Sequence, residues 1–216
     1  MRLIDLSHTI EHGMVTYPGL PGPVICDYLS WEASRAHYAA GVEFHIGKIE
    51  LVANTGTYLD APFHRYAGGA DLAALPLEPL AGLDAVLVRA SVEARAIGPE
   101  AFAGSDVRGK AVLVHTGWSA HWRTPRYLSG HPFLTGAAAR YLLDAGARLV
   151  GIDSLNIDDT ADLKRPVHSA LLNAGVPIVE HMTNLAALPA AGFRFYAVPP
   201  KVVGFGSFPV RAFASC

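Results

Sequence analysis

The residues best suited to chemistry lie in one stretch, "NTGTYLDAPFH", residues 54–64, which contains Asp60 and His64. Pro62 ends a strand here and keeps the preceding residue extended. His64 then lies just past a bend and is free to fold back over Asp60. A carboxylate and an imidazole that converge in this way can bind a metal ion or transfer a proton. From spacing alone, the simpler interpretation is a turn-capping Asp60 and a surface His64.

The same stretch carries two further polar side chains. If residues 51–60 are extended, side chains two positions apart share a face, so Asn54, Tyr58 and Asp60 point the same way. Gly56 on that face leaves room for a ligand to approach the backbone. We therefore expect one polar face at the end of a strand.

Two acidic residues end apolar strands in the second half of the chain. Residues 142–151, "LLDAGARLVG", and residues 171–180, "LLNAGVPIVE", share one pattern. Each contains the last turn of a helix, a glycine stop and a short β-branched strand, which indicates parallel strands joined by crossover helices. The pattern places Asp153 and Glu180 at the carboxyl ends of neighbouring strands, where ligands bind in open α/β sheets. We predict an α/β fold with a mixed sheet and βαβ units.

The remaining elements are consistent with one domain. Strand-like patterns cover residues 3–6, 42–53 and 110–117, and a helix is expected over 136–145 after a capping threonine. Proline and glycine are scattered, and no linker or low-complexity tract interrupts the chain. A single domain over residues 1–216 is the simplest organisation.

Composition excludes several functional classes. The chain has 216 residues, of which 51% are hydrophobic and 17% charged, with a net charge of −2. It lacks the basic surface that binding to nucleic acid or an anionic membrane requires, and no run approaches the length of a membrane span. Two separate cysteines and the absence of a signal-peptide pattern lead us to expect a cytoplasmic protein. The low surface charge predicts an apolar subunit interface and therefore a homo-oligomer.

Five segments, in order along the chain, resemble the cyclase family of metal-dependent hydrolases, which includes bacterial kynurenine formamidase, isatin hydrolase and certain polyketide cyclases. The segments are "DLSHTIEHGMVTYPGLP", "NTGTYLDAPFH", "VGIDSLNID", "VHSALLNAGVPIVEHMTNLAAL" and "PPKVVGFGSFPVRAFA". The resemblance implies a swivelling β/β/α-type domain, as in kynurenine formamidase-like proteins, and a homodimer or homotetramer.

The resemblance also implies roles for individual residues. The family signature is His-x-Gly-Thr-His-x-Asp-x-Pro-x-His. Its aspartate, a metal ligand, falls on Asp60, and its last histidine, an acid/base group, falls on His64. A later histidine and glutamate that complete the metal site match His168 and Glu180.

This sequence departs from the signature at its first two histidines, which are replaced by Asn54 and Tyr58. An amide and a neutral phenol are poor ligands for zinc, so we expect the ion at those positions to be lost. The remaining residues predict one divalent ion, zinc or manganese, bound by Asp60, His168 and Glu180. Asn54 and Tyr58 then either bind substrate through hydrogen bonds or only fill the vacated space.

The implied activity is metal-dependent hydrolysis of an amide or lactone bond in a small cyclic or aromatic substrate, as in an arylformamidase. In this hypothesis His64 transfers the proton of the attacking water. Two alternatives remain. The first is a cyclase or dehydratase that uses Tyr58 and His64 beside a reduced metal site, and the second is a non-catalytic descendant that binds a small molecule.

Overall fold

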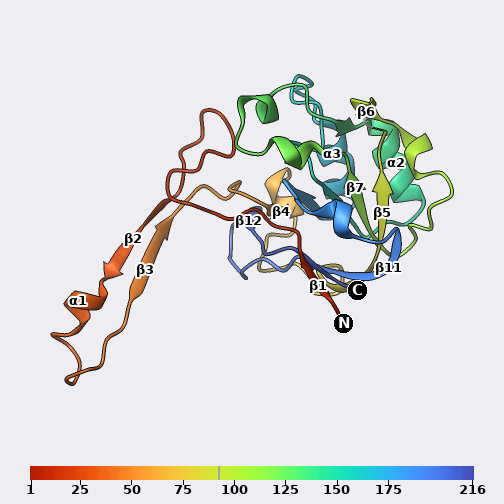
Figure 1. The fold of residues 1–216 in the computed structure, drawn as a ribbon. Coiled ribbons are helices and arrows are strands. Elements are labelled where there is room, and N and C mark those ends of the chain that lie inside the picture. The colour runs from red at the N-terminus through yellow and green to blue at the C-terminus, as the bar shows by residue number, and fades with distance from the viewer. Residues whose placement is uncertain (92) are drawn as a thin grey trace.

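A curled nine-stranded mixed sheet organises the protein, as the computed structural model shows for residues 1–91 and 93–216 (Figure 1). The strand order is β1-β13-β11-β5-β7-β9-β10-β4-β12. In that order the strands are Leu3–Asp5, Phe213–Ser215, Ala191–Tyr196, Ala81–Arg89, Ala111–His115, Leu149–Ile152, Ile178–Glu180, Tyr58–Asp60 and Ser207–Pro209.

The centre of the sheet is parallel. Strands β5, β7, β9 and β10 run in one direction, with Val112 opposite Val150 and Val150 opposite Ile178. These strands are almost continuously apolar because both faces of a parallel sheet are covered. Helix α2 (Gly136–Asp144) connects β7 to β9, and α3 (Pro166–Asn173) connects β9 to β10. The predicted mixed sheet with βαβ units is confirmed.

Capping residues determine where the two helices begin and where α2 ends. Thr135 caps α2 by accepting a hydrogen bond of 3.1 Å from the Ala138 amide, as expected for an N-cap threonine. Gly146 follows α2 with a φ of +83°, a left-handed conformation that glycine adopts without strain. Pro166 starts α3, where its missing N–H costs nothing. Both helices therefore have defined ends against the sheet.

A hydrophobic core lies on each face of the sheet. Successive residues of a strand point to opposite faces, so Leu113 belongs to one core and Val112 to the other. The core that includes Val112 also holds Leu142 of α2 and Leu171 of α3. Burial of these helices fixes α3 beside the carboxyl end of β10.

One segment departs from the sheet. Strands β2 (Val24–Leu29) and β3 (Ile46–Glu50) form a separate antiparallel hairpin with the short helix α1 (Trp31–Ser34) at its far end, and the hairpin projects from the body (Figure 1). A strand is expected over residues 42–53, but β3 includes only residues 46–50 of that range. A third, two-stranded sheet joins β6 (Ala96–Ile97) to β8 (Phe133–Leu134).

Short 3-10 helices complete the secondary structure: η1 (Pro62–His64), η2 (Pro99–Phe102), η3 (Trp118–His121), η4 (Pro125–Leu128) and η5 (Leu185–Ala187). Over the part of the chain that the structure describes, every helix is too short or too polar to cross a membrane.

Candidate active site

Strand β4 brings the polar residues of two distant segments together. It pairs antiparallel with β10 on one side, which places Tyr58 opposite Glu180. It pairs antiparallel with β12 on the other side, which places Asp60 opposite Ser207. Residues far apart in the sequence thus meet at one end of the sheet.

The strand is shorter than the sequence pattern predicted. Residues 51–57 are irregular, and β4 begins only at Tyr58. The chain turns at Gly56, which has a φ of +64° and donates a hydrogen bond of 2.9 Å to Thr16 Oγ1. The shared extended face predicted from Asn54 onward is therefore wrong, although Asn54 still lines the same cavity as Tyr58.

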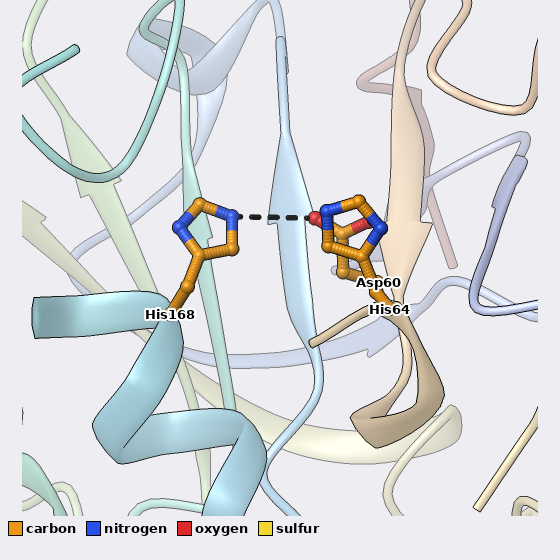
Figure 2. A group of neighbouring side chains, drawn as sticks. All are labelled: Asp60, His64 and His168. Carbon is orange, nitrogen blue, oxygen red and sulfur yellow. Dashed lines mark ion pairs between the residues drawn. The ribbon is translucent and has the colours of Figure 1, made fainter. Parts of the chain in front are cut away.

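Asp60 and His168 face one another across the site (Figure 2). Asp60 is fully buried, and its Oδ2 has no hydrogen-bond partner within the described residues. His168 Nε2 lies 3.5 Å from that oxygen and 3.7 Å from Glu180 Oε1. The other ring nitrogen, Nδ1, forms a hydrogen bond of 2.7 Å with Asp158 Oδ2. The ring is thereby oriented with Nε2 toward the two carboxylates.

These separations fit a divalent metal better than direct hydrogen bonds. Two ligand atoms each about 2.1 Å from one ion, at tetrahedral or octahedral angles, lie about 3.0–3.4 Å apart. The separations at His168 Nε2 are slightly larger than this range and too long for good hydrogen bonds. An unpartnered buried carboxylate oxygen is also costly unless a ligand satisfies it. Asp60 and His168 therefore present donor atoms that suit a divalent cation.

His64 lies next to Asp60, across from His168, as expected for a residue past the Pro62 bend (Figure 2). Its Nδ1 is 3.8 Å from Asp60 Oδ1 and 2.8 Å from Ser207 Oγ, and the Ser207 hydroxyl donates to Asp60. Asp60, His64 and His168 together offer ligand atoms that all lie within 4.8 Å of one another. A turn-capping role for Asp60 is excluded because its carboxylate is buried in this cluster.

Glu180 sits behind the cluster in a dense hydrogen-bond network. Its Oε1 accepts from the Ile157 amide at 2.6 Å, and its Oε2 accepts from the Tyr58 hydroxyl. The Tyr17 hydroxyl lies 3.0 Å from that of Tyr58, and Asn156 Nδ2 lies 3.1 Å from the Tyr17 hydroxyl. The phenol that replaces a family histidine is thus directed at Glu180.

Comparison with known proteins agrees with this geometry. Residues 4–159 match the cyclase family. The chain belongs to the cyclase family of metal-dependent hydrolases. Kynurenine formamidase of Salinibacter ruber is 30% identical to it, over 98% of this chain and 96% of the relative. Kynurenine formamidase of Bacillus cereus is 26% identical, over 97% and 95% of the two chains.

Solved structures show the same fold. A potential metal-dependent hydrolase with cyclase activity superposes with a TM-score of 0.80 at 29% identity, covering 99% of this chain and 96% of the other. Isatin hydrolase A from Labrenzia aggregata, bound to benzyl benzoate, superposes with a TM-score of 0.85 at 23% identity, covering 99% and 93%. The family and fold class inferred from the sequence are confirmed.

Electrostatics in this cyclase-family site favour a charged imidazole in the metal-free protein. Burial alone lowers the pKa of His168, but Glu180, Asp158 and Asp60 outweigh it and raise the pKa to about 10. Burial raises the pKa of Glu180, with His168 acting in the opposite direction. Burial and the charge of Glu180 raise the pKa of Tyr58 well above its ordinary value. Tyr58 therefore remains a neutral phenol, which is a poor metal ligand.

A cavity of about 250 Å³ opens beside these groups. His64, His168 and Glu180 line it, so a small molecule in the cavity reaches the acid/base and ligand atoms directly. Arg65 and Arg165 line it as well. The cavity therefore combines the candidate ligand residues with two arginines.

The sequence analysis did not identify four residues that contribute to the cyclase-family site: Tyr17, Asn156, Asp158 and Ser207. A signal existed for two of them, because Asn156 and Asp158 follow the apolar strand β9 in "GIDSLNID", at the edge where ligands bind. Ser207 carried no local signal, since only its pairing with β4 places it beside Asp60.

Other polar candidates have structural roles. His45 lies on the projecting hairpin, where it contacts Asp27 at 2.8 Å, and takes no part in the site. Asp153 lies at the end of β9, as predicted, and is buried. Its carboxylate accepts hydrogen bonds from the Thr116 amide and hydroxyl and from the Gly117 amide. These bonds hold the β7–η3 turn.

Proposed function

We propose that this cyclase-family protein is a metal-dependent hydrolase that opens an amide or lactone bond in a small cyclic or aromatic substrate. The single observation that carries the proposal is the buried Asp60 Oδ2, which has no hydrogen-bond partner among the described residues and faces His168 Nε2 at 3.5 Å, beside a cavity that His64 lines. The named relatives add support, because kynurenine formamidase and isatin hydrolase both act on bonds of this kind.

Asp60, His168 and Glu180 would hold one divalent ion, zinc or manganese. When bound, the ion polarises a carbonyl and lowers the pKa of water. Asp158 positions His168 for this role by fixing its Nδ1. Tyr58 and Ile157 position Glu180 by donating to its two oxygens. Neutral Tyr58 and the amide of Asn54 replace two family ligands, which supports one ion rather than two.

His64 would transfer the proton. The Ser207 hydroxyl donates its only proton to Asp60, so its oxygen accepts from His64 Nδ1–H. This order leaves Nε2 of His64 unprotonated and available as a base. His64 then takes a proton from the attacking water and returns it to the leaving nitrogen or oxygen.

Asn54 is the better candidate for contact with substrate. Its side chain lines the cavity, and an amide can donate to a carbonyl oxygen. Tyr58 also lines the cavity, but its proton is directed at Glu180. We therefore assign Tyr58 chiefly to holding Glu180. This assignment also makes Tyr58 less suitable as the acid of a cyclase or dehydratase.

The state of the two cysteines supports a cytoplasmic location for the protein. Cys26 and Cys216 are both exposed free thiols, which persist best in a reducing compartment such as the cytoplasm.

The test is a metal analysis joined to an isotope experiment. Protein purified without a metal-affinity tag should contain close to one zinc or manganese per chain, and His168→Ala should empty the site. Hydrolysis in ¹⁸O-labelled water should place label in the product, whereas ring closure or dehydration should not. Full turnover by metal-free protein would contradict the proposal.

A further inference from the structure

Two arginines line the cavity without a protein counterion. Arg65 and Arg165 both border it. In the part of the chain that the structure describes, neither forms an ion pair with a carboxylate, whereas Arg95 pairs with Asp159 at 2.9 Å and other arginines have similar partners. A guanidinium group keeps its charge at any pH at which the protein is folded. The cavity wall therefore carries two positive charges that the protein itself does not neutralise.

Arg65 is held in place by groups that carry no charge. Its Cζ lies 5.2 Å from the centre of the Tyr66 ring, and its Nε donates a hydrogen bond of 3.2 Å to Ser169 Oγ. The Tyr66 hydroxyl donates to the Ser169 carbonyl oxygen at 2.9 Å. The two terminal nitrogens of Arg65 form no hydrogen bond within the described residues. They are therefore available to a ligand, and the guanidinium group is already partly ordered for it.

Arg165 comes from a second segment and adopts a costly backbone conformation. It precedes α3 with a φ of +49° and a ψ of +60°, a left-handed conformation that non-glycine residues rarely adopt. Strain of this kind persists where the surrounding structure enforces it, commonly at functional sites. Nη1 donates 3.0 Å to the Asp159 carbonyl oxygen. The Nε and Nη2 groups form no hydrogen bond within the described residues.

The two arginines are fixed to the same end of one helix. Ser169, which binds Arg65, lies one turn into α3, and its amide donates to the Arg165 carbonyl oxygen at 2.9 Å. The same turn carries His168, the candidate metal ligand. Arg65 and Arg165 therefore border the cavity close to one another and close to the reaction centre.

The nearby carboxylates have other partners. Glu180 accepts hydrogen bonds from Tyr58 and from the Ile157 amide. Asp158 accepts from both the amide and the ring of His168. The negative charge that would neutralise the two arginines must therefore come from the ligand. A carboxylate fits best, because its two coplanar oxygens match the paired N–H groups of a guanidinium fork.

We propose that the substrate is a small amide or lactone that carries a carboxylate of its own, and that Arg65 and Arg165 bind this carboxylate while the scissile carbonyl lies beside His64 and His168. This inference rests on the proposed hydrolase function and specifies its substrate class. In the reaction, water adds to the carbonyl carbon, the C–N or C–O bond breaks, and the leaving nitrogen or oxygen gains a proton. A cyclic substrate would thus give a single product with two carboxylates.

Binding of matched ring compounds tests the anion site without turnover. Calorimetry on the metal-loaded full-length protein compares benzoate with benzamide, which has nearly the same shape and no charge. Benzoate should bind at least about tenfold more tightly, as expected for hydrogen bonds between charged groups. Equal binding of the two compounds by the wild type would overturn the proposal.

Substitutions assign the preference to the arginines. Arg65→Gln and Arg165→Gln should each weaken benzoate binding about tenfold, should leave benzamide binding little changed, and should together abolish the preference. Arg165→Lys keeps the charge and should retain part of it, which separates loss of charge from loss of structure. Arg148→Gln, at a separate hollow, should have no effect. A preference that persists in the double variant at unchanged metal content would assign the carboxylate to the metal ion and overturn the proposal.

A substrate pair extends the test to turnover. The pair is a formanilide that carries a ring carboxylate and the same formanilide with a carboxamide in its place. The wild type should favour the carboxylate in kcat/KM, and the Arg65→Gln, Arg165→Gln double variant should lose that preference. Equal turnover of the pair by the wild type would overturn the substrate class and leave the hydrolase proposal intact. Tight benzoate binding without turnover of either compound would count against the hydrolase proposal alone.

Discussion

The imidazole of His168 is held by Asp158, whose Oδ2 lies 2.7 Å from His168 Nδ1 and also accepts from the His168 amide at 2.9 Å. This double contact fixes the ring so that Nε2 points toward Asp60 and Glu180. A carboxylate behind a metal-binding histidine orients the ring and raises its basicity. The bond between His168 and Asp158 therefore links the start of α3 to the proposed metal site.

Asp158→Asn should weaken metal binding by about 10–100-fold, the usual effect of removing such a partner. The amide retains one acceptor for the helix but loses the negative charge that supports His168. Competition with a chromogenic chelator measures the affinity. Asp159→Asn is the matched control, because Asp159 is a neighbouring carboxylate that pairs with Arg95. Equal loss in both variants would argue against a specific role for Asp158.

Metal binding should release a proton and strengthen as pH rises from 6 to 9. The pKa of His168 is about 10 in the metal-free protein, and the imidazolium must lose its proton before Nε2 can bind an ion. Calorimetry in buffers of different ionisation enthalpy measures the proton count. Binding enthalpies that do not depend on the buffer would refute the expectation.

The same shift makes the stability of the metal-free protein depend on pH. The folded pKa of His168, about 10, lies above its unfolded value of about 6.5. The stabilisation is therefore complete below about pH 6.5 and is lost as pH rises through about 10. Denaturant unfolding of chelator-treated protein should show wild type and His168→Gln converging in free energy of unfolding at high pH. Curves that run parallel would contradict this.

Ser207→Ala should lower kcat by about tenfold or more while metal content stays unchanged, because general acid/base catalysis depends on a correctly oriented base. The serine hydroxyl joins Asp60 to His64 Nδ1. Ser207→Thr keeps a hydroxyl and should retain more activity. Loss of metal in Ser207→Ala would instead assign the serine to the metal site.

Tyr58→His combined with Asn54→His should raise metal content from one ion per chain to two, because it restores the two missing signature ligands. Tyr58→Phe should leave the ion count unchanged and reduce the free energy of unfolding by about 1–3 kcal/mol, since the Glu180 oxygen loses its donor. Elemental analysis and denaturant unfolding provide the measurements. A wild type that already binds two ions would contradict the role given to Tyr58.

Arg165→Gln should weaken inhibition by the carboxylate product about tenfold, because charge-assisted hydrogen bonds to a carboxylate are strong. Hydrolysis of an amide or lactone releases a carboxylate, and Arg65 and Arg165 both line the cavity. Product inhibition constants measure the effect. Arg126→Gln, which alters an exposed arginine on η4, should have no effect.

Several features of the site follow from the sequence alone. Asp60 and His64 converge because a proline bend follows a short strand, and both residues belong to one local segment. Glu180 lies at the end of an apolar strand because a glycine ends the preceding helix and the β-branched residues that follow it favour a strand. The prediction that His168 is a metal ligand rests on the resemblance to the cyclase family, since no local pattern distinguishes it from a surface histidine.

Tertiary structure decided which polar groups support these residues. Ser207 reaches Asp60 only because β12 pairs with β4, and Tyr58 reaches Glu180 only because β10 pairs on the other side. Local sequence indicates that a strand is present, but the length of the strand and its pairing with distant strands depend on burial of the whole sheet. For the same reason, the sequence predicts only a strand over residues 42–53, and only the folded chain shows that this strand pairs with residues 24–29 in a hairpin that stands apart from the main sheet.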